Sequence, residues 1–185
     1  MTLLGLRKFG DPVLRQKTRL LEPGEIQRSE IQQLITDIRK TNEVKKYGVG
    51  LAAPQVGVSV ALSVIGVKTT PTRPDLQPFE AVIINPSYEG VGRRIGLWEG
   101  CQSGGRGVHT LYGKALRYRK VRAQWLDEHG IKHDEMLEGF IAHVFQHETD
   151  HLDGILFVDR VRDTRSYMLA SEFRKMLRRA SKQTK

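Results

Sequence analysis

The chain has 185 residues, of which 39% are hydrophobic and 28% charged, a composition ordinary for a globular protein that is long enough to bury the core of one domain. Its single cysteine, Cys101, excludes an intramolecular disulfide and suits a reducing compartment. No stretch approaches the ~20 apolar residues of a membrane-spanning helix, and residues 1–15 carry no apolar run typical of a signal peptide. We therefore expect a cytoplasmic protein with no membrane partner.

The net charge of +9 is unevenly placed along the chain. Residues 164–185 contain seven basic residues and only one acidic residue, Glu172, so they carry +6 of the total. A concentrated positive charge of this kind favours contact with a polyanion. A solvated, charged helix end explains the same pattern equally well.

The first half of the chain predicts one helix and two strands after an irregular segment, residues 1–24. Apolar residues at spacings of three and four predict an amphipathic helix over 25–46, which Gly48 closes. A tight segment, 50–57, precedes a predicted strand at 58–67. A proline-rich loop at 69–78 then leads to a strand at 79–85, which Pro86 is expected to stop.

The second half predicts a glycine-dense segment at 90–107, two strands and two helices. The strands, at 114–126 and 131–136, are joined by a turn at 127–130. The helices cover 137–152, with Gly154 at its C-terminal cap, and 165–179. Strands in the middle and helices near both ends predict an α+β fold with mainly antiparallel sheets.

The sequence His147-Glu148-Thr149-Asp150-His151 has the spacing H-E-x-x-H. Two histidines four residues apart lie on one face of a helix, so both imidazoles can reach a single metal ion. Glu148 would stand beside the metal, where it could move a proton on and off bound water. The alternative is a surface helix turn with two solvated histidines.

Two histidines leave a metal short of ligands, and Cys101 is the best candidate for the third. No histidine follows His151, and the only glutamate after Glu148 is Glu172 in the basic tail. Cys101 lies among glycines, which let the backbone approach a metal closely. A Cys-His-His set leaves one coordination position open, as a catalytic site requires.

A third segment, residues 48–55, offers small residues and then Gln55. Small residues allow the backbone to lie against a ligand, and an amide can donate a hydrogen bond to a developing oxyanion. Taken alone, a Gly-Ala turn before a strand is more often a packing feature.

The three segments together resemble the three signature motifs of the peptide deformylase family. They read Gly-Val-Gly-Leu-Ala-Ala-Pro-Gln at 48–55, Glu-Gly-Cys-Gln-Ser at 99–103 and Gln-His-Glu-Thr-Asp-His-Leu-Asp-Gly at 146–154. Residues 10–15, Gly-Asp-Pro-Val-Leu-Arg, are similar to the family's N-terminal segment. The resemblance runs from about Gly10 to Asp159.

The resemblance implies a metal-dependent hydrolase that removes the N-formyl group from the formyl-methionine of newly made polypeptides and releases formate. It implies one divalent metal per chain, Fe(II) in the native state, with Zn, Ni or Co possible after purification. The fold it implies packs antiparallel sheets around a central metal-binding helix and adds a C-terminal helix. Residues 1–163 would form the catalytic domain, and residues 164–185 a basic helix and tail of the same domain.

Site residues follow from the resemblance position by position. Cys101, His147 and His151 would hold the metal, and Glu148 would act as general base and then acid. Gln55 and the backbone N–H of Gln102 would stabilise the oxyanion. Val49 and Gly50 would bind the extended peptide through their backbone.

The resemblance also implies a monomer, and a basic C-terminal helix that binds the ribosome through rRNA phosphates. Two other functions remain open. One is a catalytically altered relative that binds only peptide or ribosome, and the other is an H-E-x-x-H metalloprotease, which has no need of Cys101 or Gln55.

This chain differs from the family's usual pattern at a few positions. Gln102 replaces a leucine, residues 103–107 replace an aliphatic residue, a proline and a glycine, and His143 replaces an arginine. We expect His143 to pack or hydrogen-bond beneath the site rather than to bind the metal. Asp150 should orient a neighbouring group or bond within the helix. His109, His129 and His133 receive no role.

Overall fold

The computed structural model describes residues 2–45, 48–70 and 74–183, and these form an α+β fold built on one sheet. Three parts of the sequence predictions lie outside the described residues. They are the last residue of the predicted 25–46 helix, the middle of the 69–78 loop and the last two residues of the basic tail. The helices are α1 (Pro23–Ile26), α2 (Ser29–Lys45), α3 (Gly139–Leu152) and α4 (Ala170–Gln183). The strands are β1 (Gly50–Ala52), β2 (Leu62–Val67), β3 (Phe79–Gly100), β4 (Leu111–Leu126), β5 (Lys132–Glu138) and β6 (Met168–Leu169).

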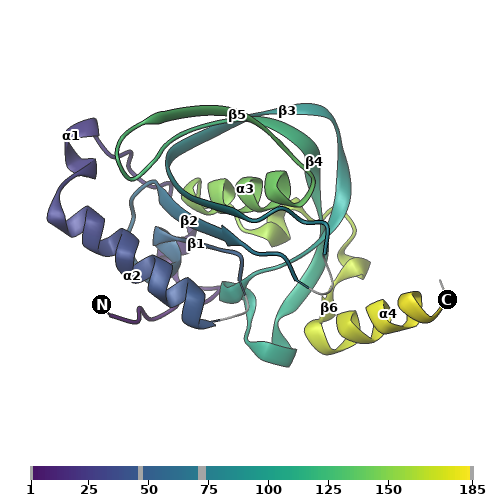
Figure 1. Ribbon diagram of the computed structural model, residues 1–185. Helices are drawn as coiled ribbons and strands as arrows, with labels where there is room; N and C mark the ends of the chain where they lie inside the picture. The colour runs from purple at the N-terminus through teal and green to yellow at the C-terminus, as the bar shows by residue number, and fades with distance from the viewer. Residues whose placement is uncertain (1, 46–47, 71–73, 184–185) are drawn as a thin grey trace.

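The sheet is antiparallel throughout. Its order is β1-β2-β3-β4-β5, so each strand pairs with its neighbour in sequence, and β6 pairs with β4. Figure 1 shows β3, β4 and β5 arching over α3, while α2 and α4 lie outside this arch. The predicted α+β fold with a mainly antiparallel sheet is confirmed.

Two hydrophobic clusters place the helices on the sheet. Alternate side chains of a strand point to opposite faces. Val82 and Ile84 therefore pack with the apolar residues of α2, and Ile83 packs with those of α3 on the other face. The α3 helix contacts all five main strands. It is therefore held on many sides, which fixes the direction of its side chains.

The predicted helix over 25–46 is wrong at its start. The chain forms the short α1 first, with Pro23 in its first turn and the Glu22 N–H bonded to the Glu25 side chain. It breaks at Gln27 and then begins α2 at Ser29. The pattern of apolar residues continues across the break, because Ile26 and Ile31 enter the same core.

The predicted stop of the strand at Pro86 is also wrong, since β3 continues to Gly100 and takes in much of the glycine-dense segment. Pro86 lies at a register shift between Ile84 and Ser87, where a missing N–H does not break the ladder. Asn85 adopts a positive φ of 50°, and its side-chain amide bonds both backbone groups of Leu21. A bulge thus carries the strand past the proline.

Other boundaries move by a few residues. The strand predicted at 58–67 begins at Leu62, and the helix predicted at 137–152 begins at Gly139 because residues 137 and 138 pair with β4. The helix predicted at 165–179 begins at Ala170, since residues 164–166 form a turn closed by Asp163 and residues 168–169 form β6. The 127–130 turn and the Gly154 cap, with φ of 73°, are confirmed. No helix among the described residues is long and apolar enough to cross a membrane.

Candidate metal centre and cleft

The α3 helix presents two histidines and a glutamate from one turn. The rings of His147 and His151 lie 4.8 Å apart, centroid to centroid, at 89° to each other. Glu148 and His151 are buried. The helix is tied to β4 through Gln146, whose amide donates to the Tyr118 carbonyl and accepts from the Tyr118 N–H, both at 2.9 Å. These bonds fix the rotation of α3 and hence the direction of both imidazoles.

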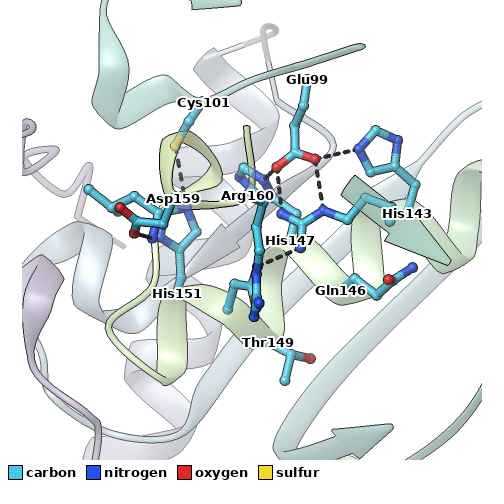
Figure 2. Close-up of polar contacts among 12 residues, drawn as sticks. Glu99, Cys101, His143, Gln146, His147, Thr149, His151, Asp159 and Arg160 are labelled. Carbon is cyan, nitrogen blue, oxygen red and sulfur yellow. Dashed lines mark hydrogen bonds and ion pairs between the residues drawn. The ribbon is translucent and has the colours of Figure 1, made fainter. Parts of the chain in front are cut away.

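Cys101 follows directly after β3 and meets these histidines. Its Sγ lies 3.3 Å from Nε2 of His151 (Figure 2). One ligand atom each from Cys101, His147 and His151 lie within 4.8 Å of one another. Metal–sulfur and metal–nitrogen bonds of about 2.3 and 2.0 Å at tetrahedral angles require donor atoms roughly 3.3–3.6 Å apart. The distance between Cys101 and His151 lies in this range. One thiolate and two imidazoles within 4.8 Å of one another are a donor set that suits one divalent ion and leaves a coordination position open.

Glu99 orients His147 from the side away from the cysteine. Its Oε1 lies 2.5 Å from Nδ1 of His147, and its Oε2 lies 2.6 Å from Nε2 of His143 (Figure 2). Bonding of Nδ1 leaves Nε2 of His147 as the nitrogen that can bind a metal. The expectation that His143 bonds beneath the site is confirmed: it bonds Glu99 and is not among the three clustered ligands.

Arg117 neutralises Glu99 inside the protein. It is 1% exposed and donates two bonds to the Glu99 carboxylate, at 2.7 and 2.9 Å, and one to Asp150 at 2.5 Å. Asp150 in turn accepts two bonds from Arg160, at 2.7 and 3.0 Å. Asp150 thus orients a neighbouring group, as predicted, and the buried charges form one connected network from Glu99 to Arg160.

The charges at the centre favour a thiolate. Burial opposes ionisation of Cys101, but the charge of His151 and hydrogen bonds from both histidines outweigh it and hold the pKa of the thiol well below its usual value. Burial also opposes a charge on His147, and Glu99 and Cys101 outweigh it, so the pKa of His147 lies well above its usual value. The thiolate is the form of cysteine that binds metals.

Glu148 differs from the other acids because it has few polar partners. Burial raises its pKa to about 7, although His147 and His151 pull in the opposite direction. Its Oε2 is buried without a hydrogen-bond partner among the described residues. A Cβ on Gly50 would lie 2.3 Å from Oε1 of Glu148, so the carboxyl group packs directly against the backbone of β1. A carboxyl group that titrates near neutral pH can both accept and return a proton.

Gln55 lies beside the thiol. Its Oε1 accepts from the Ala52 N–H at 2.9 Å, and its Nε2 donates to Sγ of Cys101 at 3.4 Å and to Oγ of Ser103 at 3.2 Å. The amide donor therefore points at the centre. Donation to a substrate oxygen would replace one of these two bonds, and this role of Gln55 stays a prediction.

A cleft of about 520 Å³ opens onto the centre. Every predicted site residue except His151 lines it. Among the described residues, the β1 strand stands at one end of the sheet order and pairs with β2 alone, so an extended peptide could pair along its outer edge. The lining residues are Leu6, Lys8, Gly48, Val49, Gly50, Gln55, Trp98, Glu99, Gly100, Cys101, Gln102, Gly105, Arg106, Gly107, Thr110, Tyr112, Phe140, His143, Val144, His147, Glu148, Ala170 and Arg174.

A sequence model of the polypeptide deformylase family matches residues 3–167. The chain belongs to this family. It is 38% identical over 172 residues to the peptide deformylase of Leptospira biflexa, an alignment that covers 90% of this chain and 92% of that one. As a family member it is an enzyme, a hydrolase, and the match over most of the chain removes support for the metalloprotease alternative.

Solved deformylase structures share the fold. A class I type b peptide deformylase from Acinetobacter baumannii, bound to Met-Ala-Ser, has a TM-score of 0.77 and 30% identity, over 86% of this chain and 99% of that one. A Synechococcus elongatus peptide deformylase in complex with actinonin has a TM-score of 0.73 and 35% identity, over 88% and 81%. This deformylase thus shares its architecture with proteins crystallised with a peptide or an inhibitor.

The sequence did not identify the residues that support the deformylase centre. Glu99 belongs to the second motif, but the motif predicts no role for it, and the sequence predicts none for Arg117 or Arg160. The sequence does contain one signal for Glu99: residues i and i+2 of an extended segment point to the same face, which indicates that Glu99 and Cys101 lie on one side of the chain. Arg117 gave no signal, because its pairing with Glu99 depends on the register of β3 and β4.

Gln102 contains a buried amide without a partner, and this predicts a stabilising substitution. Its Nε2 has no hydrogen-bond partner among the described residues, while its carbonyl accepts from Nζ of Lys8 at 2.9 Å. Leucine would keep the backbone and remove the unpaired amide. We expect Gln102→Leu to raise the free energy of unfolding by about 1 kcal/mol, measured by urea denaturation.

Gln146→Leu is the matched control for this substitution, since the amide of Gln146 makes all of its bonds to Tyr118 and the helix. It should lower the free energy of unfolding. A loss of stability in Gln102→Leu similar to that in Gln146→Leu would contradict the prediction.

Proposed function

We propose that this protein removes the N-formyl group from the formyl-methionine of newly made polypeptides and releases formate. One observation carries the proposal: in a member of the deformylase family, the donor atoms of Cys101, His147 and His151 converge within 4.8 Å beside a cleft. The metalloprotease alternative explains neither the cysteine nor the amide of Gln55 that bonds it.

Cys101, His147 and His151 would hold one divalent ion, Fe(II) in the native protein, with Zn, Ni or Co possible after purification. When bound, such an ion supplies Lewis-acid activation of water at neutral pH. The protein's own contribution is orientation. Glu99 orients His147 through a bond to Nδ1. The Gln55 amide and the Ser103 N–H both donate hydrogen bonds to Sγ of Cys101, and these bonds stabilise the negative charge on the sulfur. With the ion bound, α3 would be the central metal-binding helix of the fold.

Glu148 would move the proton. Its carboxyl group is buried beside the cleft, and burial raises its pKa to about 7. The carboxylate would accept a proton as water attacks the formyl carbon, and would deliver it to the departing amine. Gln55 and the backbone N–H of Gln102 would donate hydrogen bonds to the oxygen that becomes negative during attack.

The peptide would lie along β1 in an extended conformation. Val49 and Gly50 line the cleft, and Gly50 belongs to the edge strand, whose backbone at Gly50 would pair with a substrate. The Acinetobacter baumannii relative was crystallised with Met-Ala-Ser, a peptide that begins with methionine. Backbone pairing of this kind accepts many side chains, as an enzyme for newly made chains requires.

Formate release tests the proposal directly. The protein is purified without oxygen, its metal content is measured, and formate release from a formyl-methionyl peptide is followed. Formate release that depends on bound metal supports the deformylase. A metal-loaded protein without release supports the catalytically altered binding protein, and cleavage at peptide bonds instead would support a metalloprotease.

We further propose a cytoplasmic monomer, organised as a catalytic domain over 1–163 with 164–185 as its basic helix and tail. The exposed Arg178 and Arg179 on α4 suit contact with rRNA phosphates. The double substitution Arg178→Glu and Arg179→Glu is expected to weaken co-sedimentation with ribosomes. It should also reduce the salt dependence of binding, because fewer phosphate contacts release fewer counterions, about one for each contact. The variant with both substitutions should keep its activity on short peptides.

The control for ribosome binding makes the same change of charge on the sheet, at the exposed Arg93 and Arg119. It should bind ribosomes as the native chain does. Equal co-sedimentation of all three proteins at every salt concentration would reject a role of α4 in ribosome binding.

A further inference from the structure

The cleft has a wall that comes from α4, beyond the residues 3–167 that match the deformylase family. Ala170 and Arg174 of this helix both line the cleft. Residues four apart on a helix lie on one face, so the buried Ala170 marks the face that also carries Arg174. Trp98 and Tyr112 of the sheet also line the cleft.

Several contacts fix this wall in place. Just before α4, β6 pairs with the start of β4, and the Ala170 N–H bonds the Thr110 carbonyl at 2.8 Å. Phe173 stacks on Tyr112 with ring centroids 4.4 Å apart at 14°, and its ring lies 5.3 Å from that of Trp98. Arg174 follows Phe173 directly, so its backbone is held beside the cleft.

The exposed charges around the cleft are all positive. Among the described residues that line it, Lys8, Arg106 and Arg174 are the exposed charged side chains. The two acids of the lining, Glu99 and Glu148, are only 5% and 2% exposed and lie at the metal centre. A cleft lined with one sign of exposed charge concentrates ligands of the opposite sign.

We propose that Arg174, together with Arg106, makes the cleft select formylated peptides that carry an acidic side chain downstream of the methionine. The inference rests on the proposed function and adds a preference among its substrates. The formyl group must reach the buried centre, so the following residues of the peptide lie toward the exposed rim. A carboxylate there gains an ion pair with a guanidinium, which presents several donors in a fixed plane.

The test compares formyl-methionyl peptides that differ by one Glu or Gln at the second, third or fourth residue. The native chain is expected to have a kcat/KM about two- to fivefold higher for the best-placed Glu than for Gln at the same position, the range of one exposed ion pair. The preference should decrease as salt is raised. Arg174→Gln should reduce the ratio of kcat/KM for the Glu peptide to kcat/KM for the matching Gln peptide, and Arg174→Glu should bring that ratio below one.

The matched control is Lys175→Gln, which removes one positive charge from the next residue of α4. Lys175 bonds Glu172 and does not line the cleft, so this variant should keep the preference for Glu. Equal kcat/KM for Glu and Gln peptides in the native chain at low salt, at all three positions, would overturn the inference while leaving deformylation intact. Failure to release formate from any peptide with metal bound would instead reject the proposed function.

Discussion

Glu148→Gln is expected to lower kcat by about 10²–10⁴-fold, the usual contribution of a general acid–base group, with the metal still bound. Glutamine has nearly the same volume but cannot accept and return the proton. The three proposed ligands, Cys101, His147 and His151, remain unchanged. Formate release and metal stoichiometry, measured on the same sample, check both parts of the prediction.

The same substitution should stabilise the metal-free protein. The pKa of Glu148 rises from an ordinary value of 4.5 to about 7 on folding, because the carboxyl group is buried. The folded chain then holds a proton that the unfolded chain has lost, so stability falls as the pH rises from 4.5 to about 7. Glu148→Gln removes this decrease, and the difference in free energy of unfolding from the native chain should grow over that range.

The control for Glu148 is Glu138→Gln, the same change at an exposed glutamate that precedes α3 and pairs with Lys120. It should leave both formate release and the pH dependence of stability nearly as they are. A Glu148→Gln protein that keeps its metal and releases formate at a rate near that of the native chain would rule out Glu148 as the base.

Arg117→Met should be the most destabilising substitution of the buried network. It leaves Glu99 and Asp150, at 5% and 2% exposure, without their shared cation. Breaking a buried ion pair from one side costs about 3–5 kcal/mol. Glu99 would keep only its bonds to His143 and His147, and Asp150 only its bonds to Arg160. Urea denaturation of the metal-free protein measures the loss without a contribution from metal binding.

Arg117→Met should also weaken metal binding by about 10–100-fold, the usual effect of losing the groups that orient a ligand histidine. Arg122→Met is the matched control on the same strand, since Arg122 is exposed and its pair with Asp134 lies at the surface. It should cost far less stability than Arg117→Met, since an exposed ion pair adds little to folding. Equal losses in the two variants would show that the buried network adds no stability beyond an ordinary surface pair.

The sequence alone determined the parts of the site that depend on local geometry. The spacing of His147 and His151 on a helix places both imidazoles on one face whatever surrounds them, and the structure has α3 over this stretch. The turn at 127–130 is equally local, because its two strands are joined by four residues. The gathering of Cys101 with the histidines was also expected, from the chemistry of an incomplete ligand set.

Tertiary structure decided what depends on pairing between distant segments. Proline lacks the N–H that a strand donates, so Pro86 alone predicts the end of a strand. The strand β3 nevertheless continues, because Pro86 lies in a bulge and Asn85 beside it is bonded to Leu21. Arg117 meets Glu99 and Asp150 only through the register of β3 on β4 and the packing of α3. Arg174 reaches the cleft because Phe173 stacks on Tyr112, more than sixty residues earlier. Burial and register arise from the whole fold, so local spacing identified the ligands but neither the charges that support them nor the wall that faces the substrate.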